Sequence, residues 1–533
     1  MEHDRHPKDT ENKRVAKAAG VVGAATFLSR IFGFLRDVVV AAFFGAGVAT
    51  DAFFVAFRIP NVLRRLFAEG SLTIAFIPVF TEYLKRKSKE DAIELANAAF
   101  TLLSIILVVV SLLGIVFAPW IVKIIGWGFI KTPDRFELTV FLTRIMFPYI
   151  FFISLMALAM GILNSLRHFA APALAPVVLN IAMIAAVFLL GHAFDEPITA
   201  LAVGVMVGGV LQLAMQFPFL VRVGVRIRAN FHFRHPGIRQ IGLLMLPAVF
   251  GAAVYQINVL VGTLLASFLP IGSVSYLYYA DRLVQFPLGV FAIAISTAVL
   301  PSLSREAARG DLGGLRETLS YALRLTMFIT IPAMTGLIVL REPIIRLLFQ
   351  RGAFDSLTTV MTAQALLFYS IGLWAFAALR VFVSAFYSLQ DTKTPVKVAV
   401  IAMLANILFS VALMGPLKHG GLALALSLAS TLQLCLLIYL LRKRLGGIGG
   451  SEVVGSMMRS IFSSVIMGVG IYFLAATVFG DSTTQGFAGL TLRVIMVIGA
   501  GLFVYLVCAR IFGSTELSYV MELLRREKKT AGP

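Results

Sequence analysis

The sequence predicts an all-α polytopic membrane protein with about fourteen transmembrane helices. Of its 533 residues, 59% are hydrophobic and 14% are charged, and the mean hydropathy is +0.91. Soluble domains, by comparison, carry about 25% charged residues. Apolar blocks long enough to cross a bilayer as helices recur along nearly the whole chain. The blocks are too long and too uniformly apolar for the alternating strands of an outer-membrane β-barrel.

Apolar length, polar breaks and Pro or Gly punctuation place these helices along the chain. A hydrophilic, basic tail (1–17) precedes a predicted N-terminal lobe (18–222), whose six helices are expected at 18–45, 52–83, 93–123, 136–165, 172–191 and 197–222. A predicted C-terminal lobe (238–442) follows, with helices at 238–268, 273–304, 318–340, 357–388, 396–415 and 420–442. Two further helices (456–479 and 488–512) precede a second tail at 513–533.

The basic residues between these helices lie mainly in the connections on one side of the membrane. After the N-terminal tail they are KRKSK at 85–89, Arg167, residues 222–239, Arg305 to Arg316, Lys393 with Lys397, RKR at 442–444 and RREKK at 525–529. Because basic loops stay on the cytoplasmic side, both termini are predicted in the cytoplasm, which agrees with an even number of spans. The segment 341–354 is basic but falls outside, and its helical apolar spacing predicts a short helix at the outer interface.

An internal repeat supports the division into two lobes. SLRHFAAP at 165–172 matches SLQDTKTP at 388–395, and IPVF at 77–80 matches LPSL at 300–303, both at an offset of 223 residues. The offset covers six helices, so the two copies have the same orientation. We therefore expect two parallel six-helix lobes around a central cavity, plus two C-terminal helices, and a substrate site between the lobes.

Charged residues are concentrated where the chain is otherwise apolar. They are Arg30, Arg36, Asp37, Asp51, Arg58, Arg64, Arg65 and Glu69 in the first two predicted helices, and Asp281 and Arg282 in the eighth. Several follow the seven-residue spacing of one helical face. An arginine at the bilayer centre costs roughly 2.5–3.5 kcal/mol, so this concentration predicts a polar cavity that receives an anionic substrate.

The arginines of this set outnumber its acids, and their planar guanidinium groups bind phosphate through paired hydrogen bonds. A pyrophosphate would match the surplus positive charge. Two alternatives remain open at this point. The acids could neutralise the arginines and only join helices, or Arg36 and Arg58 could extend to a membrane interface.

Other functional classes find little support in the sequence. The signatures HExxH, GxSxG, Walker A and paired CxxC do not occur, so no enzyme and no cofactor is expected. The two cysteines, Cys435 and Cys508, fall inside predicted helices, which argues against a disulfide framework or a metal cluster. His232 and His235 lie in a loop with nothing nearby to complete a metal site. The net charge of +19 sits in short loops, so nucleic-acid binding is not expected.

The run SRIFGFLRDVVVAAFFGAG, continued by TDAFFVAFRIPNVLRRLFAEGSL and AFIPVF, closely resembles the MurJ (MviN) lipid II flippases of bacteria. YYADRLVQFPLGVF, LPSLS, FYSLQDTKTPVK and GPLKHGGLALA extend the resemblance, which covers about residues 15–445. The family belongs to the multidrug/oligosaccharidyl-lipid/polysaccharide exporter superfamily. The resemblance implies transport of undecaprenyl-pyrophosphate-linked disaccharide-pentapeptide from the inner to the outer leaflet of the cytoplasmic membrane, for peptidoglycan synthesis.

The resemblance also implies a site and partners. The family's cavity arginines correspond here to Arg30, Arg36, Arg64 and Arg282, and its cavity acids to Asp37, Asp51 and Glu69. Its last two helices form a groove for the lipid tail, here 456–512, although Arg493 departs from a wholly apolar groove. Helices 238–268 and 396–415 contain no Asp or Glu, so no sodium site of the kind found in some members is expected. The expected partners are lipid II, membrane lipids and cell-wall synthesis proteins.

Three alternatives compete with a lipid II flippase. A flippase for another polyprenyl-linked glycan would also need arginines for phosphate. A drug or cation antiporter of the same superfamily would need an excess of acids in the cavity. A non-transporting scaffold for cell-wall enzymes would tolerate the loss of Arg30, Arg64 or Arg282, whereas a flippase would not.

Overall fold

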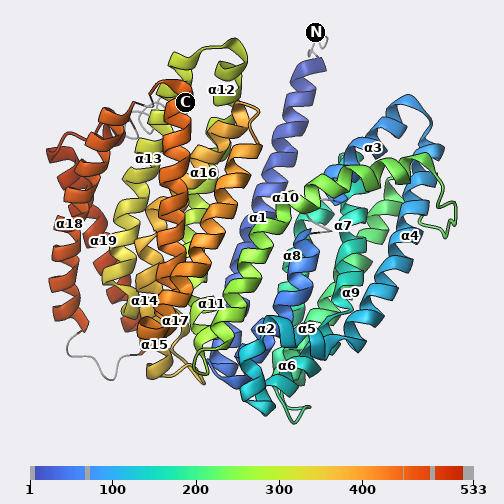
Figure 1. Ribbon diagram of the computed structural model, residues 1–533, viewed down its shortest axis with the longest axis horizontal. Helices are drawn as coiled ribbons and strands as arrows, with labels where there is room; N and C mark the ends of the chain where they lie inside the picture. The colour runs from blue at the N-terminus through green and yellow to red at the C-terminus, as the bar shows by residue number, and fades with distance from the viewer. Residues whose placement is uncertain (1–6, 67–71, 448, 480–485, 520–533) are drawn as a thin grey trace, which may run out of the picture. The chain divides into compact units, whose positions relative to one another are not determined.

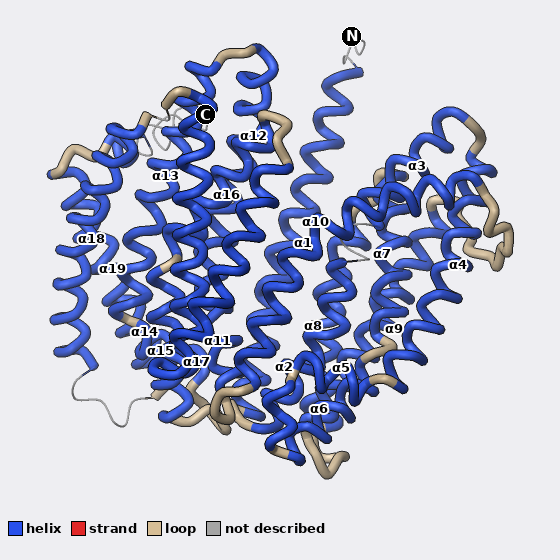
Figure 2. Tube along the Cα trace, viewed as in Figure 1, coloured by secondary structure: helices blue, strands red, loops and turns tan. Residues whose placement is uncertain are grey.

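The computed structural model describes residues 7–66, 72–447, 449–479 and 486–519, and within these ranges the regular structure is entirely helical (Figure 2). The candidate residue Glu69 and most of the two predicted tails lie outside the described residues. The chain forms two compact units, Met1–Gly272 and Ser273–Pro533. Each unit is described by itself.

The first unit is built from ten α-helices, one 3-10 turn and a π-helical turn at residues 64–66 among its described residues (Figure 1). They are α1 (Pro7–Phe44), α2 (Val48–Leu63), α3 (Thr73–Arg86), α4 (Lys89–Val116), α5 (Ala118–Ile125), η2 (Trp127–Lys131), α6 (Pro133–Met146), α7 (Tyr149–Ser165), α8 (Ala170–Leu190), α9 (Ile198–Arg222) and α10 (Pro236–Ser267). The first helix begins at Pro7 rather than near residue 18, so it extends into the sequence expected to form a tail.

The second unit begins directly after the loop that follows α10. Its described elements are α11 (Ser273–Pro287), the π-helical turn η3 (Leu288–Ala292), α12 (Ile293–Arg309), α13 (Leu312–Val339), α14 (Arg341–Phe349), α15 (Ser356–Ile371), α16 (Leu373–Ser388), α17 (Lys393–Leu445), α18 (Gly450–Phe479) and α19 (Phe487–Ile511). The last two, α18 and α19, pack side by side (Figure 1). The short helix expected at 341–354 is present as α14.

Nine described helices are long and apolar enough to cross a membrane, or ten if the bent pair α15–α16 is one span. The protein is therefore an all-helical polytopic membrane protein. The helices α1 and α10 and the α2–α3 segment lie where three further spans are expected. The full number of fourteen stays a prediction.

One of the nine helices, α17, is a hairpin. A straight helix of its 53 residues would be about 80 Å long. However, Nη1 of Arg444 near its end lies 2.8 Å from Oδ2 of Asp391, just before its start. The backbone reverses at Lys418, where φ is 50° and ψ is −129°. The chain thus folds into the two segments expected at 396–415 and 420–442, with their far ends together.

The helix bounds repeat at the offset that the sequence predicts. Helix α4 covers 89–116 and α13 covers 312–339, while α9 ends at Arg222 and α17 ends at Leu445. Arg167 and Gln390, also 223 residues apart, both have left-handed backbones, with φ of 61° and 56°. The same hydrogen bond closes the helix before each of them, from His168 N to Leu163 O and from Asp391 N to Phe386 O. The two copies therefore share the backbone geometry of this connection as well as the bounds of their helices.

The units do not divide at the boundary that the repeat predicts. By the offset, α10 is the counterpart of α1 and should open the second copy. Instead α10 contacts α3, α4, α5 and η2 of the first unit. At its end, Ser267 Oγ accepts a hydrogen bond from Gly128 N at 2.9 Å. The lobes predicted at 18–222 and 238–442 stay a prediction about the repeat, distinct from these contact units.

Small residues bring α8 and α9 close together in the first unit. A Cβ atom on Gly204 would lie 2.8 Å from the Cβ of Ala186, and one on Gly208 would lie 2.6 Å from Cδ1 of Leu179. Close approach of this kind is how helices associate in membranes, where apolar side chains gain little by contact with each other rather than lipid. The packing fixes α8, which supplies Asn180 to the site described below.

We expect Gly421→Ala to destabilise the α17 hairpin. A Cβ atom at this position would meet the backbone oxygen of Leu413 at 2.2 Å, and backbone cannot move aside as a flexible side chain can. Overpacking of this kind costs about 1–3 kcal/mol. The measurement is the apparent melting temperature in detergent. The matched control is Gly415→Ala in the same hairpin, where nothing lies within 4 Å; equal effects of the two changes would contradict the prediction.

We also expect acid to weaken the Asp391–Arg444 contact, which joins the two ends of the α17 hairpin. The hydrogen bond from Thr394 N lowers the pKa of Asp391, helped by the Thr394 hydroxyl and the charge of Arg444. A carboxyl whose pKa is depressed in the folded protein stabilises it above the unfolded pKa, and this stability is lost as the pH falls. The difference in melting temperature between the wild type and Asp391→Asn should stay constant from pH 7 to 5 and shrink below about pH 4. A difference that grows on acidification would refute this.

Candidate functional site

Arg36 and Asp37 form a buried ion pair on α1. Nη2 of Arg36 lies 2.7 Å from Oδ1 of Asp37, and the side chains are only 9% and 3% exposed. Nη1 of Arg36 also donates to Oδ1 of Asn180 on α8 at 3.0 Å. Neighbouring residues on a helix point in different directions, so the long arginine side chain bends back to reach the carboxylate. The guanidinium is thus neutralised and oriented by its own helix and by α8.

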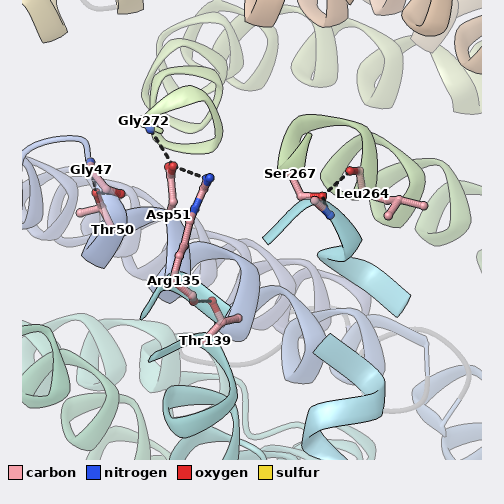
Figure 3. A network of polar contacts seen from close by, with 9 residues as sticks. Gly47, Thr50, Asp51, Arg135, Thr139, Leu264, Ser267 and Gly272 are labelled. Atoms are coloured by element: carbon pink, nitrogen blue, oxygen red, sulfur yellow. Dashed lines mark hydrogen bonds and ion pairs between the residues drawn. The ribbon is translucent and has the colours of Figure 1, made fainter. Parts of the chain in front are cut away.

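Asp51 forms a second buried pair, with Arg135 (Figure 3). Its position is set locally at the start of α2. There Oγ1 of Thr50, the residue before Asp51, accepts a hydrogen bond from Gly47 N at 2.8 Å. Nη2 of Arg135 on α6 donates to Oδ2 of Asp51 at 2.5 Å, and both side chains are nearly fully buried. The same oxygen accepts from the backbone N–H of Gly272 at 2.7 Å. Asp51 therefore joins α2, α6 and the loop after α10.

An aromatic ring completes this network. The guanidinium carbon of Arg135 lies 3.7 Å from the centre of the Phe129 ring in η2. A guanidinium over the face of a ring is attracted by the negative potential of that face, and more strongly away from water. Arg135 is thus held by a carboxylate and by a ring.

Arg64 is half-buried in a π-helical turn that continues α2. Its Nε and Nη2 both donate to Oδ1 of Asn61, at 2.9 and 2.7 Å. The next residue, Arg65, is exposed. The forked contact with Asn61 sets the plane of the Arg64 guanidinium, as bidentate recognition requires.

Arg30 and Arg282 are exposed arginines on helices of the two units, α1 and α11. Nη2 of Arg282 donates to the Tyr278 hydroxyl at 3.0 Å, and its guanidinium carbon lies 5.2 Å from the centre of that ring. Its neighbour Asp281 accepts from Gln285 Nε2 at 3.4 Å. A π-helical turn follows α11 directly, a feature frequent at functional sites.

The structure therefore separates the predicted site residues by environment. It brings together Arg36 with Asp37, but it joins Asp51 to a residue that was not predicted. The described side chains provide guanidinium groups suited to an anion. Among them, no group of three His, Cys, Asp or Glu could hold a metal ion.

Two arginines were missed by reasoning from the sequence. Arg135 lies one residue before the helix predicted at 136–165 and was not weighed as a site residue; the available signal was that a buried Asp51 needs a cation. Arg380 lies inside the predicted helix 357–388, which is otherwise apolar and was therefore assigned as a span without regard to this charge. Its side chain is exposed on α16. The same signal that singled out Arg30, a charge inside an apolar helix, applied to it.

We expect the Asp51–Arg135 pair to be strongly coupled. Removing one partner of a buried pair costs about 3–5 kcal/mol because the other charge is left uncompensated. Asp51→Asn and Arg135→Gln should each lower the melting temperature in detergent, and the double variant should lose less than the sum. Arg144→Gln, an exposed arginine on the same helix α6, is the matched control. Single effects that simply add would show that the pair is not coupled.

Comparisons with known proteins agree with this architecture. The family model described as lipid II flippase MurJ matches residues 40–507. A probable lipid II flippase MurJ from Vibrio cholerae is 41% identical over 435 residues, covering 80% of this chain and 83% of that protein. The lipid II flippase MurJ of Burkholderia cenocepacia is 39% identical over 432 residues, covering 80% and 84%.

One solved structure belongs to the same family, and a second shares the fold. A lipid II flippase MurJ in an inward closed conformation has a TM-score of 0.78 at 30% identity, covering 92% of this chain and 98% of its own. An inward-facing MATE family multidrug transporter of the MOP superfamily has a TM-score of 0.65 at 15% identity, covering 80% and 98%, which shows a shared fold alone. The chain therefore belongs to the MurJ family of lipid II flippases, which are membrane transporters and not enzymes.

Proposed function

We propose that the protein carries lipid II from the inner to the outer leaflet of the bacterial cytoplasmic membrane by alternating access, and that Arg30, Arg64 and Arg282 bind its pyrophosphate. The observation that carries this proposal is the exposure of Arg30 and Arg282 on helices of a membrane protein. An exposed guanidinium there is costly unless a polar cavity or an anion receives it. A pyrophosphate offers several oxygens to the planar arginine fork.

The other predicted site residues have a different role in this proposal. Asp37 and Asn180 hold Arg36, and Arg135 and Gly272 N–H hold Asp51. These contacts favour positioning of the helices that carry the exposed arginines over direct binding of an anion. Glu69 remains a candidate from the sequence.

The C-terminal pair α18–α19 is proposed as the path of the polyprenyl tail. Both helices expose large apolar side chains at helical spacing, among them Phe462, Val469 and Phe473 on α18 and Leu492 and Phe503 on α19. Arg493, the departure noted in the sequence, donates through Nη1 to the carbonyl oxygen of Val478 at 2.6 Å. A cation is favourable at the C-terminal end of a helix, so this charge caps α18 and stays off the apolar stripe.

The proposal includes the topology and partners predicted from the sequence. Both termini would lie in the cytoplasm, in line with the basic connections. Membrane lipids and cell-wall synthesis proteins would be further partners. A flippase for another polyprenyl-linked glycan and a non-transporting scaffold are the competing functions that the experiment below must separate.

We expect Arg282→Ala to abolish complementation of a depletion strain and to trap precursor on the cytoplasmic side. Loss of a charge-assisted hydrogen-bonding group costs about 1.5–3 kcal/mol, so lipid II binding by the purified protein should weaken roughly 10- to 100-fold. Arg282→Lys should recover part of this, because it restores the charge but not the fork. Arg30→Ala should behave like Arg282→Ala.

The matched control is Arg309→Ala, an exposed arginine at the other end of the 273–309 helical span. Protein levels must be equal in the membrane. If Arg282→Ala and Arg30→Ala complement as well as the control, the binding role is wrong and a scaffold is favoured. Equal competition by a different polyprenyl-pyrophosphate glycan would instead favour the broader flippase.

A further inference from the structure

The connection between α4 and α6 presents a face rich in tryptophan. We call Trp120, Lys123, Ile124 and Trp127 the tryptophan face. Trp120, Ile124 and Trp127 are 63%, 68% and 52% exposed. Nζ of Lys123 lies close to both indoles, 5.3 Å from the ring centre of Trp120 and 5.7 Å from that of Trp127. The spacing of three and four residues puts Trp120, Lys123 and Ile124 on one side of α5, and the contact with Lys123 brings Trp127 of η2 to the same side.

The opposite side of this segment is locked into the first unit. Val122 is fully buried. Gly128 N donates to Ser267 Oγ, and a Cβ at Gly128 would lie 2.2 Å from the Ser267 carbonyl oxygen. Phe129 is fully buried under the Arg135 guanidinium. The tryptophan face therefore has a fixed direction and does not belong to a loose loop.

The second copy of the repeat lacks the tryptophans of this face. The counterpart of α5 at the offset of 223 is α14, and Ile345 is fully buried there as Val122 is in α5. Helix α14 packs against α19, and Arg351 just after it lies 5.2 Å from the ring centre of Phe487. The positions of Trp120 and Trp127 are occupied there by Pro343 and Gln350. In the described part of the first unit, the corresponding face stays exposed.

The chain changes from apolar to polar across this face. Val116 and Phe117, just before it, are 66% and 49% exposed. Lys131 and Asp134, just after it, are exposed charged residues. This order of hydrocarbon, indole with a lysine, and charge is the order met on passing from a bilayer core through the headgroups to water. A protein partner would require no such gradient.

From this we infer that the tryptophan face lies in the headgroup region of the bilayer, on the side predicted to be outside, and that Lys123 binds a phospholipid phosphate. Indoles suit this region because the ring body is apolar and the N–H can hydrogen-bond. The ammonium group would sit against the phosphate while the two rings reach the acyl-chain boundary. The segment would act as a short amphipathic anchor.

Tryptophan fluorescence can test this directly, because the chain has only three tryptophans. Trp374→Phe leaves Trp120 and Trp127 as the emitters. The full-length protein is reconstituted in phosphatidylethanolamine and phosphatidylglycerol vesicles with a quencher near the headgroup or deep in the acyl chains. We expect stronger quenching by the shallow quencher. The control carries Trp120→Phe and Trp127→Phe and reports only Trp374.

Lys123→Gln should reduce phospholipid bound to the purified protein, measured by native mass spectrometry, roughly fivefold, whereas Lys123→Arg should retain it. Stronger quenching by the deep quencher, or quenching by aqueous iodide alone, would overturn the inference. So would a photo-crosslinker at position 120 that captures a second copy or another protein in place of lipid. Unchanged phospholipid binding by Lys123→Gln would show that Lys123 does not bind a phospholipid phosphate.

Discussion

A charged side chain inside a bilayer must be paired, hydrated or bound to a ligand, and this constraint underlies the rest of the structure. In the first unit it is met by two buried pairs, Arg36 with Asp37 and Asp51 with Arg135. Each pair also reaches another element, so neutralisation and helix positioning come from the same contacts. In the proposed function, exposed arginines such as Arg30 receive the external anion, so the binding groups are distinct from the groups that support them.

The duplicated scaffold carries different chemistry in its two copies. The helix bounds and a left-handed connection recur at 223 residues, yet the repeat counterparts of Asp51 and Arg135 are Val274 and Thr358, which cannot form an ion pair. Conversely, Asp391 pairs with Arg444 at the ends of the α17 hairpin. The counterpart of Arg444 in the first copy is Val221, which cannot form this pair. Backbone geometry is therefore shared, while the polar contacts that close each copy are its own.

Most helix positions followed from apolar length. A span must satisfy its backbone hydrogen bonds internally and must cross a hydrocarbon core about 30 Å thick. Even the hairpin in α17 was anticipated, since Lys418 and the glycines around it break the apolar run. Two features were less accessible. Helix α1 begins as early as Pro7, in sequence that is hydrophilic. Helix α10 packs in the first unit, although the repeat assigns it to the second copy.

The sequence by itself determined the helical membrane class, the repeat and the set of charges that needed an explanation, because these depend on composition and local periodicity. Only the tertiary structure decided which charges are neutralised. Arg135 is far from Asp51 along the chain, and nothing local indicates that α6 brings its guanidinium within 2.5 Å of that carboxylate. Pairing depends on distances between helices, and these are set by packing, such as the glycine contacts of α8 and α9.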